Sequence, residues 1–501
     1  MNGSLSRQTA PPKTSALQTI PGILLGAALL FLAGCAPVGP DYRPPAAPAP
    51  GSWHAEMRQG LAADETDPQL LARWWTALDD PVLTGLIDSA VANNLDLREA
   101  GARVREARAR RGISRAGEFP TLDASGRATR SRGSENSGSG VTRNFYTLGF
   151  DAGWEIDIFG GLRRTVEAAD ADLEASRENL RDVLVSLTAE VALNYLDTRT
   201  FQSRLTVAEA NLKIQRETYD LVESRYQAGL GDELALQQAR YNLESTAAQI
   251  PSLRSSLEGA KNRLAVLTAR IPGTVHELLA ERNPLPVPPP EIAVGLPAEA
   301  LRRRPDIRRA ERELAAQTAR IGVAAADLYP KFRLAGSIGL ESLKSAKLFE
   351  SASRTWSLGP SASWNLFDAG AIRRNIEVQS ALEEQFLLRY ETAVLTALEE
   401  VENALTAYAE EQLRRERLLA AVDAARQAQT LAEIQYNTGL VEFNTVLEAQ
   451  RALLSFEDQL TQSDGTVVSN LIRLYKAMGG GWSAAPSIPA TELSTERISE
   501  P

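Results

Sequence analysis

Cysteine, histidine and methionine are scarce in this chain: its 501 residues include one Cys, two His and three Met. Structural zinc sites draw several ligands from Cys and His, and a Cys/His catalytic pair needs both side chains within hydrogen-bonding reach. With one cysteine and two histidines as the whole supply, the composition excludes both kinds of site. A lone cysteine also leaves an exported chain without internal disulfides.

The chain also lacks an excess of positive charge, because 54 Lys and Arg stand against 64 Asp and Glu, a net charge of −10. Proteins that bind nucleic acid usually carry a basic patch. The run Arg302 to Arg304 is short and ends at Pro305. We therefore expect no nucleic-acid partner.

Catalytic fingerprints are missing as well: the chain has no P-loop, no dinucleotide-binding glycine motif, no HExxH and no nucleophile elbow. Its charged residues follow i,i+3 and i,i+4 spacings, which are typical of a solvated helix face. We expect a protein that is not an enzyme and that uses no metal or cofactor.

Long apolar runs are confined to the N-terminus, where Ile20 to Ala33 is too short to span a bilayer and fits a signal-peptide core. The sequence Leu-Ala-Gly-Cys that ends at Cys35 resembles a bacterial lipobox. This resemblance implies a signal peptide over residues 1–34, cleavage before Cys35 and lipidation of its thiol and amine. Ala36, in place of Asp, favours the outer membrane. The alternative is a cysteine inside a conventional signal core.

Residues 35–68 are rich in proline and alanine, a composition that favours an extended, lipid-anchored tether over a packed core. A second proline-rich segment, residues 272–297, is expected to be a linker between two domains. The tail, residues 482–501, is polar and is expected to be disordered.

A membrane-type strand is predicted at residues 146–158, where apolar and polar residues alternate. Such alternation puts one face of a strand against lipid and the other against water. This stretch alone also fits a half-buried strand of a soluble sandwich. Its recurrence in the second half of the chain favours the membrane interpretation.

The chain is a tandem duplication with a constant offset of 210 residues. Landmarks that recur at this offset are Asp96/Asp306, Arg110/Arg320, Pro120/Pro330, Trp154/Trp364, Arg164/Arg374, Tyr226/Tyr436 and Gly229/Gly439. So long a period indicates two similar halves of one architecture rather than a solenoid. We place the repeats at residues 69–271 and 298–481.

Each repeat is expected to contain a helix, a β-hairpin, a long helix, a glycine-containing turn and a last helix. In the first repeat these are residues 81–115, strands 121–131 and 146–158, a helix to residue 225, the turn 226–231 and a helix over 232–267 disturbed at Pro251. In the second repeat, a helix begins at Pro305 and the strands cover 331–340 and 355–366. Apolar residues occupy even positions in these strands, and the expected lipid-facing residues are Leu148, Phe150, Trp154, Leu334, Leu358 and Trp364.

The predicted fold class is mainly α with a membrane β-barrel. Four strands per chain cannot close a barrel, and open strand edges cannot lie in lipid, so several chains must combine. Two chains give the smallest bacterial barrel, whereas three give twelve strands and a lumen wide enough for solutes. Coiled-coil helices that follow the strands would continue this ring as a tube.

At this point the sequence resembles a known family, the TolC-like outer-membrane channel lipoproteins of tripartite efflux systems. The resemblance covers nearly the whole mature chain and rests on the motifs GPDYRPP, FDAGWEIDIFGGLRR, LRRRPDIRRAERELAA, ADLYPKF, LEEVENAL, YNTGLVEFNTVLEAQR and LYKAMGGGW. It implies a homotrimer in the outer membrane of a Gram-negative bacterium, with a 12-stranded barrel and a helical periplasmic tunnel that passively conducts small molecules. It also implies two partners, a periplasmic adaptor protein and an inner-membrane pump of the resistance-nodulation-division class.

Two alternatives remain. One is the same duct serving type I protein secretion. The other is a periplasmic coiled-coil scaffold lipoprotein without a pore, which would not explain four strands with preserved parity.

The turns at Tyr226, Gly229, Tyr436 and Gly439 each lie one long helix away from the strands. We expect both turns at the periplasmic end, where they dock the adaptor. The alternative is that both glycines only cap helices.

The expected gate follows the second turn, where Asn444, Glu448 and Arg451 share one helical face. The resemblance assigns Glu448 and Arg451 to the constriction that closes the periplasmic end. The sequence departs at Asn444, where relatives commonly carry an apolar residue. The alternative is an i,i+3 surface pair of Glu448 and Arg451, worth about 0.2–0.5 kcal/mol.

Overall fold

A computed structural model of the chain describes residues 37–46 and 49–483, so the expected signal peptide, Cys35 and residues 484–501 lie outside the described part. The chain forms two compact units. The first comprises the residues up to Arg43, Arg108–Asp172 and Leu314–Gln385, and the second comprises Pro44–Ala107, Leu173–Glu313 and the residues from Phe386. Within the described residues, no helix has both the length and the apolar character needed to cross a lipid bilayer.

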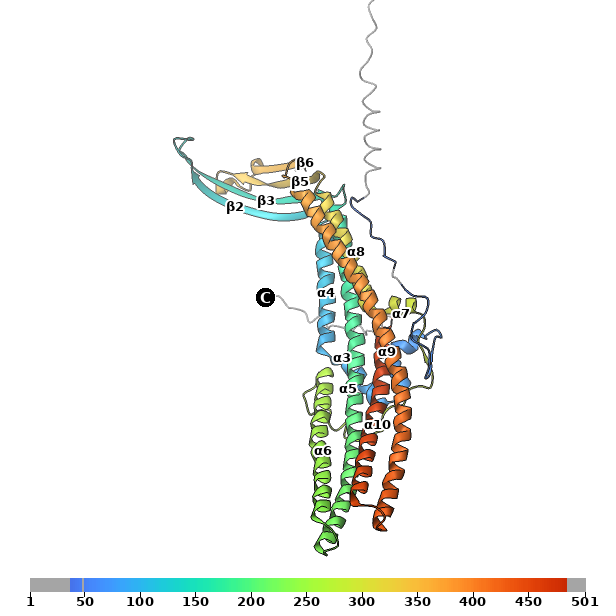
Figure 1. Cartoon of the computed structure of the whole chain (residues 1–501). Coiled ribbons are helices and arrows are strands. Elements are labelled where there is room, and N and C mark those ends of the chain that lie inside the picture. The colour runs from blue at the N-terminus through green and yellow to red at the C-terminus, as the bar shows by residue number, and fades with distance from the viewer. Residues whose placement is uncertain (1–36, 47–48, 484–501) are drawn as a thin grey trace, which may run out of the picture. The chain divides into compact units, whose positions relative to one another are not determined.

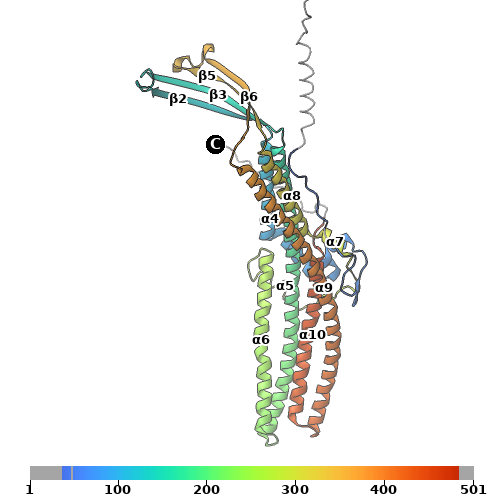
Figure 2. The same ribbon diagram turned by 45° about the horizontal axis from the view of Figure 1, so that its top comes forward.

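The first unit is built on an antiparallel four-stranded sheet of order β2-β3-β5-β6 (Figures 1 and 2). The strands are β2 (Thr121–Arg132), β3 (Thr142–Ile156), β5 (Lys331–Ser342) and β6 (Arg354–Ser363), and two 3-10 turns, η2 (Ser345–Lys347) and η3 (Ser351–Ser353), lie between β5 and β6. The register of the β2–β3 hairpin, with Thr121 opposite Gly153, recurs in the β5–β6 hairpin at the offset of 210, with Lys331 opposite Ser363. The duplication therefore extends to individual strand pairs.

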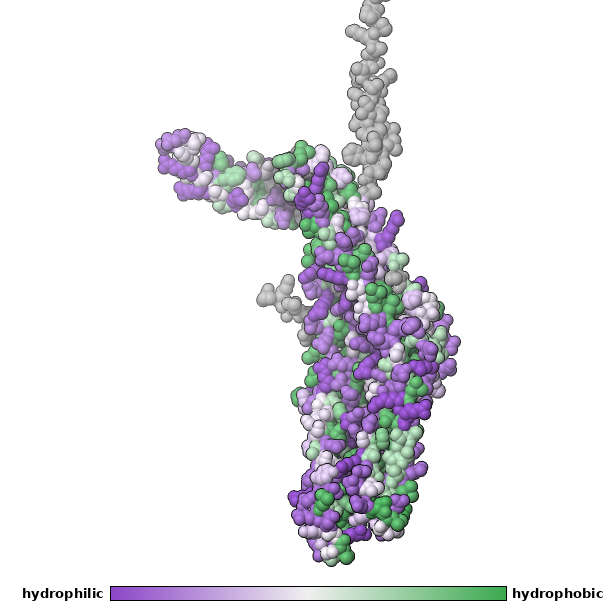
Figure 3. Space-filling view, viewed as in Figure 1, coloured by the Kyte–Doolittle hydropathy of each residue, from purple (hydrophilic) through white to green (hydrophobic). Residues whose placement is uncertain are grey.

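Strand pairing keeps most apolar positions on one face, because even-numbered residues pair with even-numbered residues across the sheet; Phe145 and Ala335 are exceptions. Leu148 lies opposite Leu340 and Trp154 lies opposite Leu334. Successive side chains of a strand point to opposite faces, so the odd, mainly polar residues share the other face. Figure 3 shows hydrophobic side chains along the sheet and hydrophilic side chains at the tip of the β2–β3 hairpin.

Six helices make up most of the two repeats, and their lengths match in pairs. The long helices α5 (Gly161–Gln227) and α9 (Ala371–Asn437) have 67 residues each; α4 (Leu95–Ala116) and α8 (Pro305–Ala326) have 22; α6 (Glu233–Leu267) and α10 (Phe443–Ala477) have 35. Pro251 does not interrupt α6, contrary to expectation.

The helix predicted over residues 81–115 is in fact two helices, α3 (Pro81–Asn93) and α4, separated by Asn94. Asn94 accepts a hydrogen bond from the Leu97 amide at 3.0 Å and caps α4, while its Nδ2 donates to the Leu267 carbonyl, at the end of α6, at 2.9 Å. An asparagine side chain accepts a hydrogen bond from a helix amide in this way when it stands just before the helix begins, as Asn94 does between α3 and α4. Asn94 therefore joins the start of α4 to the end of α6.

The second repeat makes the same connection with a different residue. Arg304, at the position equivalent to Asn94, donates from Nη1 to the carbonyl of Ala477, the last residue of α10, at 2.9 Å. Its guanidinium also pairs with Asp306 and Glu400, each at 2.7 Å. One side chain in each repeat thus connects the two short helices end to end, α4 to α6 and α8 to α10.

The second unit has the main hydrophobic core, and it contains segments that the composition did not predict. These are α2 (Pro68–Ala72), η1 (Trp74–Leu78), α7 (Pro297–Arg303) and the parallel pair β1 (Leu61–Ala62) with β4 (Ile292–Ala293). Trp53 and Leu61 are buried in this core, although both belong to the segment expected to be a tether. Trp482, expected in the disordered tail, is half-buried, and the guanidinium groups of Arg181 and Arg308 lie against its ring.

Candidate functional site

The apolar face of the sheet carries five of the six residues expected to face lipid, namely Leu148, Phe150, Trp154, Leu334 and Leu358. Trp364 is an exception, because β6 ends at Ser363, one residue earlier. Leu148, Phe150 and Leu358 are exposed in the single chain. A face of this kind needs an apolar environment or a partner to cover it.

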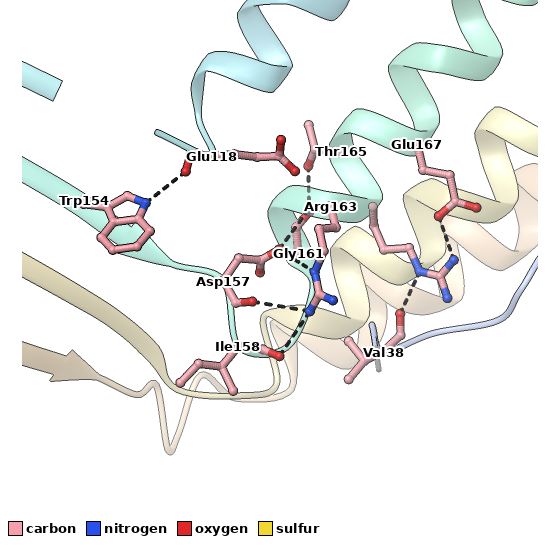
Figure 4. Close-up of polar contacts among 10 residues, drawn as sticks. Val38, Glu118, Trp154, Asp157, Ile158, Gly161, Arg163, Thr165 and Glu167 are labelled. Carbon is pink, nitrogen blue, oxygen red and sulfur yellow. Dashed lines mark hydrogen bonds and ion pairs between the residues drawn. The ribbon is translucent and has the colours of Figure 1, made fainter. Parts of the chain in front are cut away.

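Two tryptophans fasten the strands to the preceding turns in the same way. The indole Nε1 of Trp154 donates to the Glu118 carbonyl at 2.9 Å (Figure 4), and that of Trp364 donates to the Leu328 carbonyl at 3.0 Å. Amphipathic indoles are typical of the boundary between membrane and water. Trp364 thus lies at the end of its strand and not within the lipid-facing rows.

The junction between β3 and α5 is held by Asp157 and Arg163 (Figure 4). The Asp157 carboxylate accepts a hydrogen bond from the Arg163 amide at 2.9 Å, and the Arg163 guanidinium bonds the carbonyls of Asp157 and Ile158 at 3.3 Å. A carboxylate at the start of a helix stabilises its free amides. These bonds fix the direction in which the helix leaves the sheet.

Arg164, next along α5, is 2% exposed and holds the N-terminal segment of the first unit. Its Nε donates to the Val38 carbonyl at 3.1 Å and its Nη1 pairs with Glu167 at 2.7 Å (Figure 4). Its Nη2 pairs with Asp41 at 2.7 Å. A side chain on Gly39 would collide with Gly322, so the segment packs closely on α8. Its equivalent in the second repeat, Arg374, is exposed and pairs with Glu377.

The two turns expected to dock a partner lie close together in the second unit. The Arg225 guanidinium lies 4.9 Å from the centre of the Tyr436 ring. Gly229 and Gly439 have φ values of 75° and 77°, and the backbone N–H of each donates a hydrogen bond to the carbonyl three residues back, after the end of its helix. This left-handed conformation favours glycine. Leu230 is 80% exposed, so the tips present apolar side chains to solvent.

The expected gate residues lie on α10, but they do not pair as the sequence suggested. Asn444 Nδ2 donates to Glu448 Oε1 at 2.8 Å. Arg451 turns towards α6, where its Nε donates to Asn242 Oδ1 at 2.9 Å and its guanidinium bonds the Tyr241 hydroxyl and covers the Tyr241 ring. Among the ion pairs of the described residues, Glu448 and Arg451 do not form one, so the i,i+3 surface pair is wrong.

Sequence reasoning missed Tyr241 and Asn242, which come from the first repeat. The signal was present, since Tyr241 stands at the position equivalent to Arg451, 210 residues earlier. It also missed Gln450, which is 2% exposed and whose Nε2 donates to Thr218 on α5 at 3.0 Å. Gln450 and Arg451 thus connect α10 to two helices of the first repeat, α5 and α6.

A cleft of about 210 Å³ lies beside these residues in the second unit. It is lined by Ile214, Glu217, Thr218, Leu221, Glu433, Tyr436, Asn437, Phe443 and Val446. Its walls come from both repeats and combine apolar side chains with two glutamates. Such a surface suits a partner helix with apolar and basic residues.

Comparison with known proteins gives a consistent result. A sequence model described as outer membrane efflux protein matches residues 86–270 and 296–480. The solvent efflux pump outer membrane protein SrpC of Pseudomonas putida is 34% identical over 91% of this chain and 98% of its own length, and nodulation protein T of Rhizobium leguminosarum bv. trifolii is 33% identical over 91% and 96%. The solved outer-membrane channel OprN has a TM-score of 0.84 at 37% identity, and covers 89% of this chain and 99% of its own.

Proposed function

Because this chain belongs to the outer membrane efflux protein family and is an outer-membrane efflux channel of a Gram-negative bacterium, we propose that it forms the exit duct of a tripartite pump. In this role it conducts small molecules passively from the periplasmic machinery to the exterior. An energy-supplying pump does the work, so the chain needs no catalytic step of its own.

One observation carries this proposal, the four-stranded sheet with an apolar face and two unpaired edges, β2 and β6. Free backbone groups at a strand edge are costly in lipid, and a closed ring removes both edges. Three copies give a barrel of twelve strands with a polar interior, formed by the odd-numbered residues. A coiled-coil scaffold without a pore would leave the apolar face unexplained.

The partners follow from the same architecture. We assign a periplasmic adaptor to the tips at Tyr226, Gly229, Tyr436 and Gly439, where exposed leucines and the acidic cleft provide apolar and charged contacts. An inner-membrane pump of the resistance-nodulation-division class supplies the energy. Lipidation of Cys35 anchors the chain in the outer membrane.

The gate is assigned to Asn444, Glu448 and Arg451 with Tyr241 and Asn242. Threefold symmetry would repeat each charge three times around one axis. The glutamates would repel one another, whereas each Arg451 is held by the first repeat of its own chain. Closure is therefore expected to depend on salt concentration, because salt screens the repulsion between the glutamates as well as the polar contacts of Arg451.

The test is conductance of the purified protein in planar bilayers, together with its mass in detergent by light scattering. We expect the mass of three chains and discrete conductance steps. A protein that is monomeric under conditions in which it remains folded, and that gives no conductance, would overturn the proposal.

A further inference from the structure

The apolar face of the sheet carries positive charge at one end. In the four strands, the even-numbered positions hold three charged side chains, and all three are arginines, Arg130, Arg132 and Arg354. Each lies within three residues of the strand end that is remote from the helices, on β2 or on β6. The odd-numbered face carries both signs of charge, for example Asp123 and Arg127 on β2. The face expected to meet lipid is therefore uncharged along its length and cationic at its outer end.

The two hairpins present one arginine each at the same level of the sheet. In the first hairpin, Arg130 of β2 lies opposite Asn144 of β3. In the second hairpin, Leu340 of β5 lies opposite Arg354 of β6. The offset of 210 residues relates these two pairs, so the arginines come from strands that are not equivalent. Each hairpin thus supplies one cation at this level, from the strand at the edge of the sheet.

The level of these arginines matches the outer border of the lipid. On β3, ten residues separate Trp154 from Asn144, which lies opposite Arg130. In the second repeat, ten residues separate Trp364 from Arg354. Ten residues extend about 33 Å along a strand, which at the tilt of barrel strands is roughly 25 Å along the membrane normal, the height of the apolar band. With the indoles at the inner boundary, the arginines lie at the outer boundary, where a charge on the lipid-facing side is tolerated.

Two of the three arginines have no counter-charge in the chain. Arg132 pairs with Glu135 of the hairpin loop at 2.8 Å. Arg130 and Arg354 are exposed, and neither belongs to an ion pair among the residues that the structure describes. A guanidinium matches the geometry of a phosphate group and forms paired hydrogen bonds with it. Asn144 adds an amide donor beside Arg130, because residues directly opposite in a sheet share one face.

We propose that Arg130 and Arg354 bind the phosphate groups of an anionic lipid in the outer leaflet, with Asn144 as a further hydrogen-bond donor. Clusters of basic residues at the membrane surface bind anionic headgroups in this way. Lipid A, the glycolipid of the outer leaflet in Gram-negative bacteria, carries phosphate groups next to its acyl chains. The proposal rests on the duct proposed above, because it requires the apolar face in lipid and the helices in the periplasm.

The affinity of the purified protein for lipid A in neutral detergent tests this proposal. The probes are bisphosphoryl lipid A and the same lipid without its phosphates, so that the acyl chains are identical. The wild type should prefer the phosphorylated lipid. Arg130→Gln and Arg354→Gln should each lower the affinity for this lipid about fivefold, the usual contribution of one basic residue at a lipid headgroup. Their affinity for the lipid without phosphates should stay unchanged.

Two arginines on the other face provide matched controls. Arg127→Gln and Arg143→Gln each remove an exposed arginine from the same hairpin, but from odd-numbered positions. Both controls should bind the phosphorylated lipid as the wild type does. Equal losses in the controls, or a wild type that binds both lipids equally, would overturn the proposal. Inorganic phosphate at the concentration of the lipid should not displace it, and displacement would overturn the assignment to a lipid.

One further measurement needs no variant, and another separates this proposal from the duct. The preference of the wild type for the phosphorylated lipid should decline as salt is added, because salt screens exposed charges. A preference that is unchanged at high salt counts against the arginines. Mass in detergent and conductance test the duct itself. A conducting trimer without any preference for phosphate overturns the lipid site and leaves the duct standing, whereas a folded monomer without conductance overturns both.

Discussion

Arg451 and Tyr241 occupy equivalent positions of the two repeats, and they contact each other, with the Arg451 guanidinium 4.6 Å from the centre of the Tyr241 ring. Two helices that touch at equivalent residues lie at the same level. α6 and α10 therefore run side by side in matching register, as neighbours in a ring would. Because the two equivalent residues differ in type, this contact places the Arg451 cation on α10 against the aromatic ring of Tyr241 on α6.

Loss of this contact should open the periplasmic end. We expect Arg451→Ala or Glu448→Ala to raise single-channel conductance, because Arg451 holds α10 against α6 and Glu448 orients Asn444 on the gate face of α10. Arg426→Ala is the control, since Arg426 pairs with Glu457 across α9 and α10 outside the proposed gate. Unchanged conductance in both gate variants, with an intact trimer, would reject the gate assignment.

The two faces of the sheet are predicted to tolerate an added charge differently. Arginine in place of Leu148 or Leu358 should cost about 2–4 kcal/mol if the site lies near the bilayer midplane, because the charge would face lipid. Thr147→Arg, on the other face, should be mild and should alter conductance. Trimer yield and resistance to denaturation in detergent measure the difference. Equal tolerance on both faces would contradict the barrel assignment.

Cys35 is predicted to be the acylated first residue of the mature protein. Cys35→Ala should yield a chain that is unprocessed or lacks acyl groups, because the acceptor thiol is gone. Intact-mass spectrometry of the outer-membrane fraction gives the answer directly. A wild-type protein that retains Met1 to Gly34 and carries no acyl chain would refute this prediction.

The tips are predicted to touch the adaptor. A cysteine at Ala228 or Thr438, reacted with a bifunctional crosslinker in cells, should capture it. Ala424→Cys is the matched control, exposed on α9 and roughly 20 Å from the tip. If the cysteine at position 424 captured the adaptor and the cysteines at positions 228 and 438 did not, the docking surface would lie elsewhere.

Acid should weaken the attachment of the linker to α6. The hydrogen bond from His276 Nε2 to Glu258, at 2.5 Å, together with Lys261 at 3.0 Å, lowers the pKa of Glu258 below its ordinary value of 4.5. A depressed carboxyl pKa stabilises the fold above the unfolded-state value, and this stabilisation is lost as pH falls through the folded-state value.

The unfolding temperature of the wild type should therefore decline more steeply below about pH 5 than that of Glu258→Gln. Glu277→Gln, an exposed change on the same linker, should follow the wild type. Identical pH profiles for Glu258→Gln and the wild type would show that the contact does not contribute.

Patterns that repeat along the chain were sufficient to predict the strands, the long helices and the duplication. Alternation predicted the shared face of Leu148 and Leu334, because the period of a strand is intrinsic to its backbone. The end of β6 before Trp364 and the break at Asn94 depend on single hydrogen bonds to distant carbonyls, which no local pattern reveals.

The proline-rich composition led to a wrong prediction for Trp53, because the segment expected to be an extended tether packs into the core. Trp53 enters the core because its indole donates to the Gly295 carbonyl at 2.9 Å, and a buried N–H needs such an acceptor. The partners of Arg451 were not predicted because they come from the other repeat, and sequence spacing on one helix cannot report contacts between helices. Comparing equivalent positions would have suggested Tyr241.

The hydrogen bond from Arg164 to the Val38 carbonyl also fixes the position of the N-terminal segment next to the junction between β3 and α5. Cys35 is three residues from Val38, and three residues reach at most about 11 Å even when fully extended. If Cys35 carries the predicted acyl chain, that chain would enter the bilayer within this distance of the junction between β3 and α5. On that prediction, the surface of the inner leaflet would lie at the level of Arg164, close to where the strands begin.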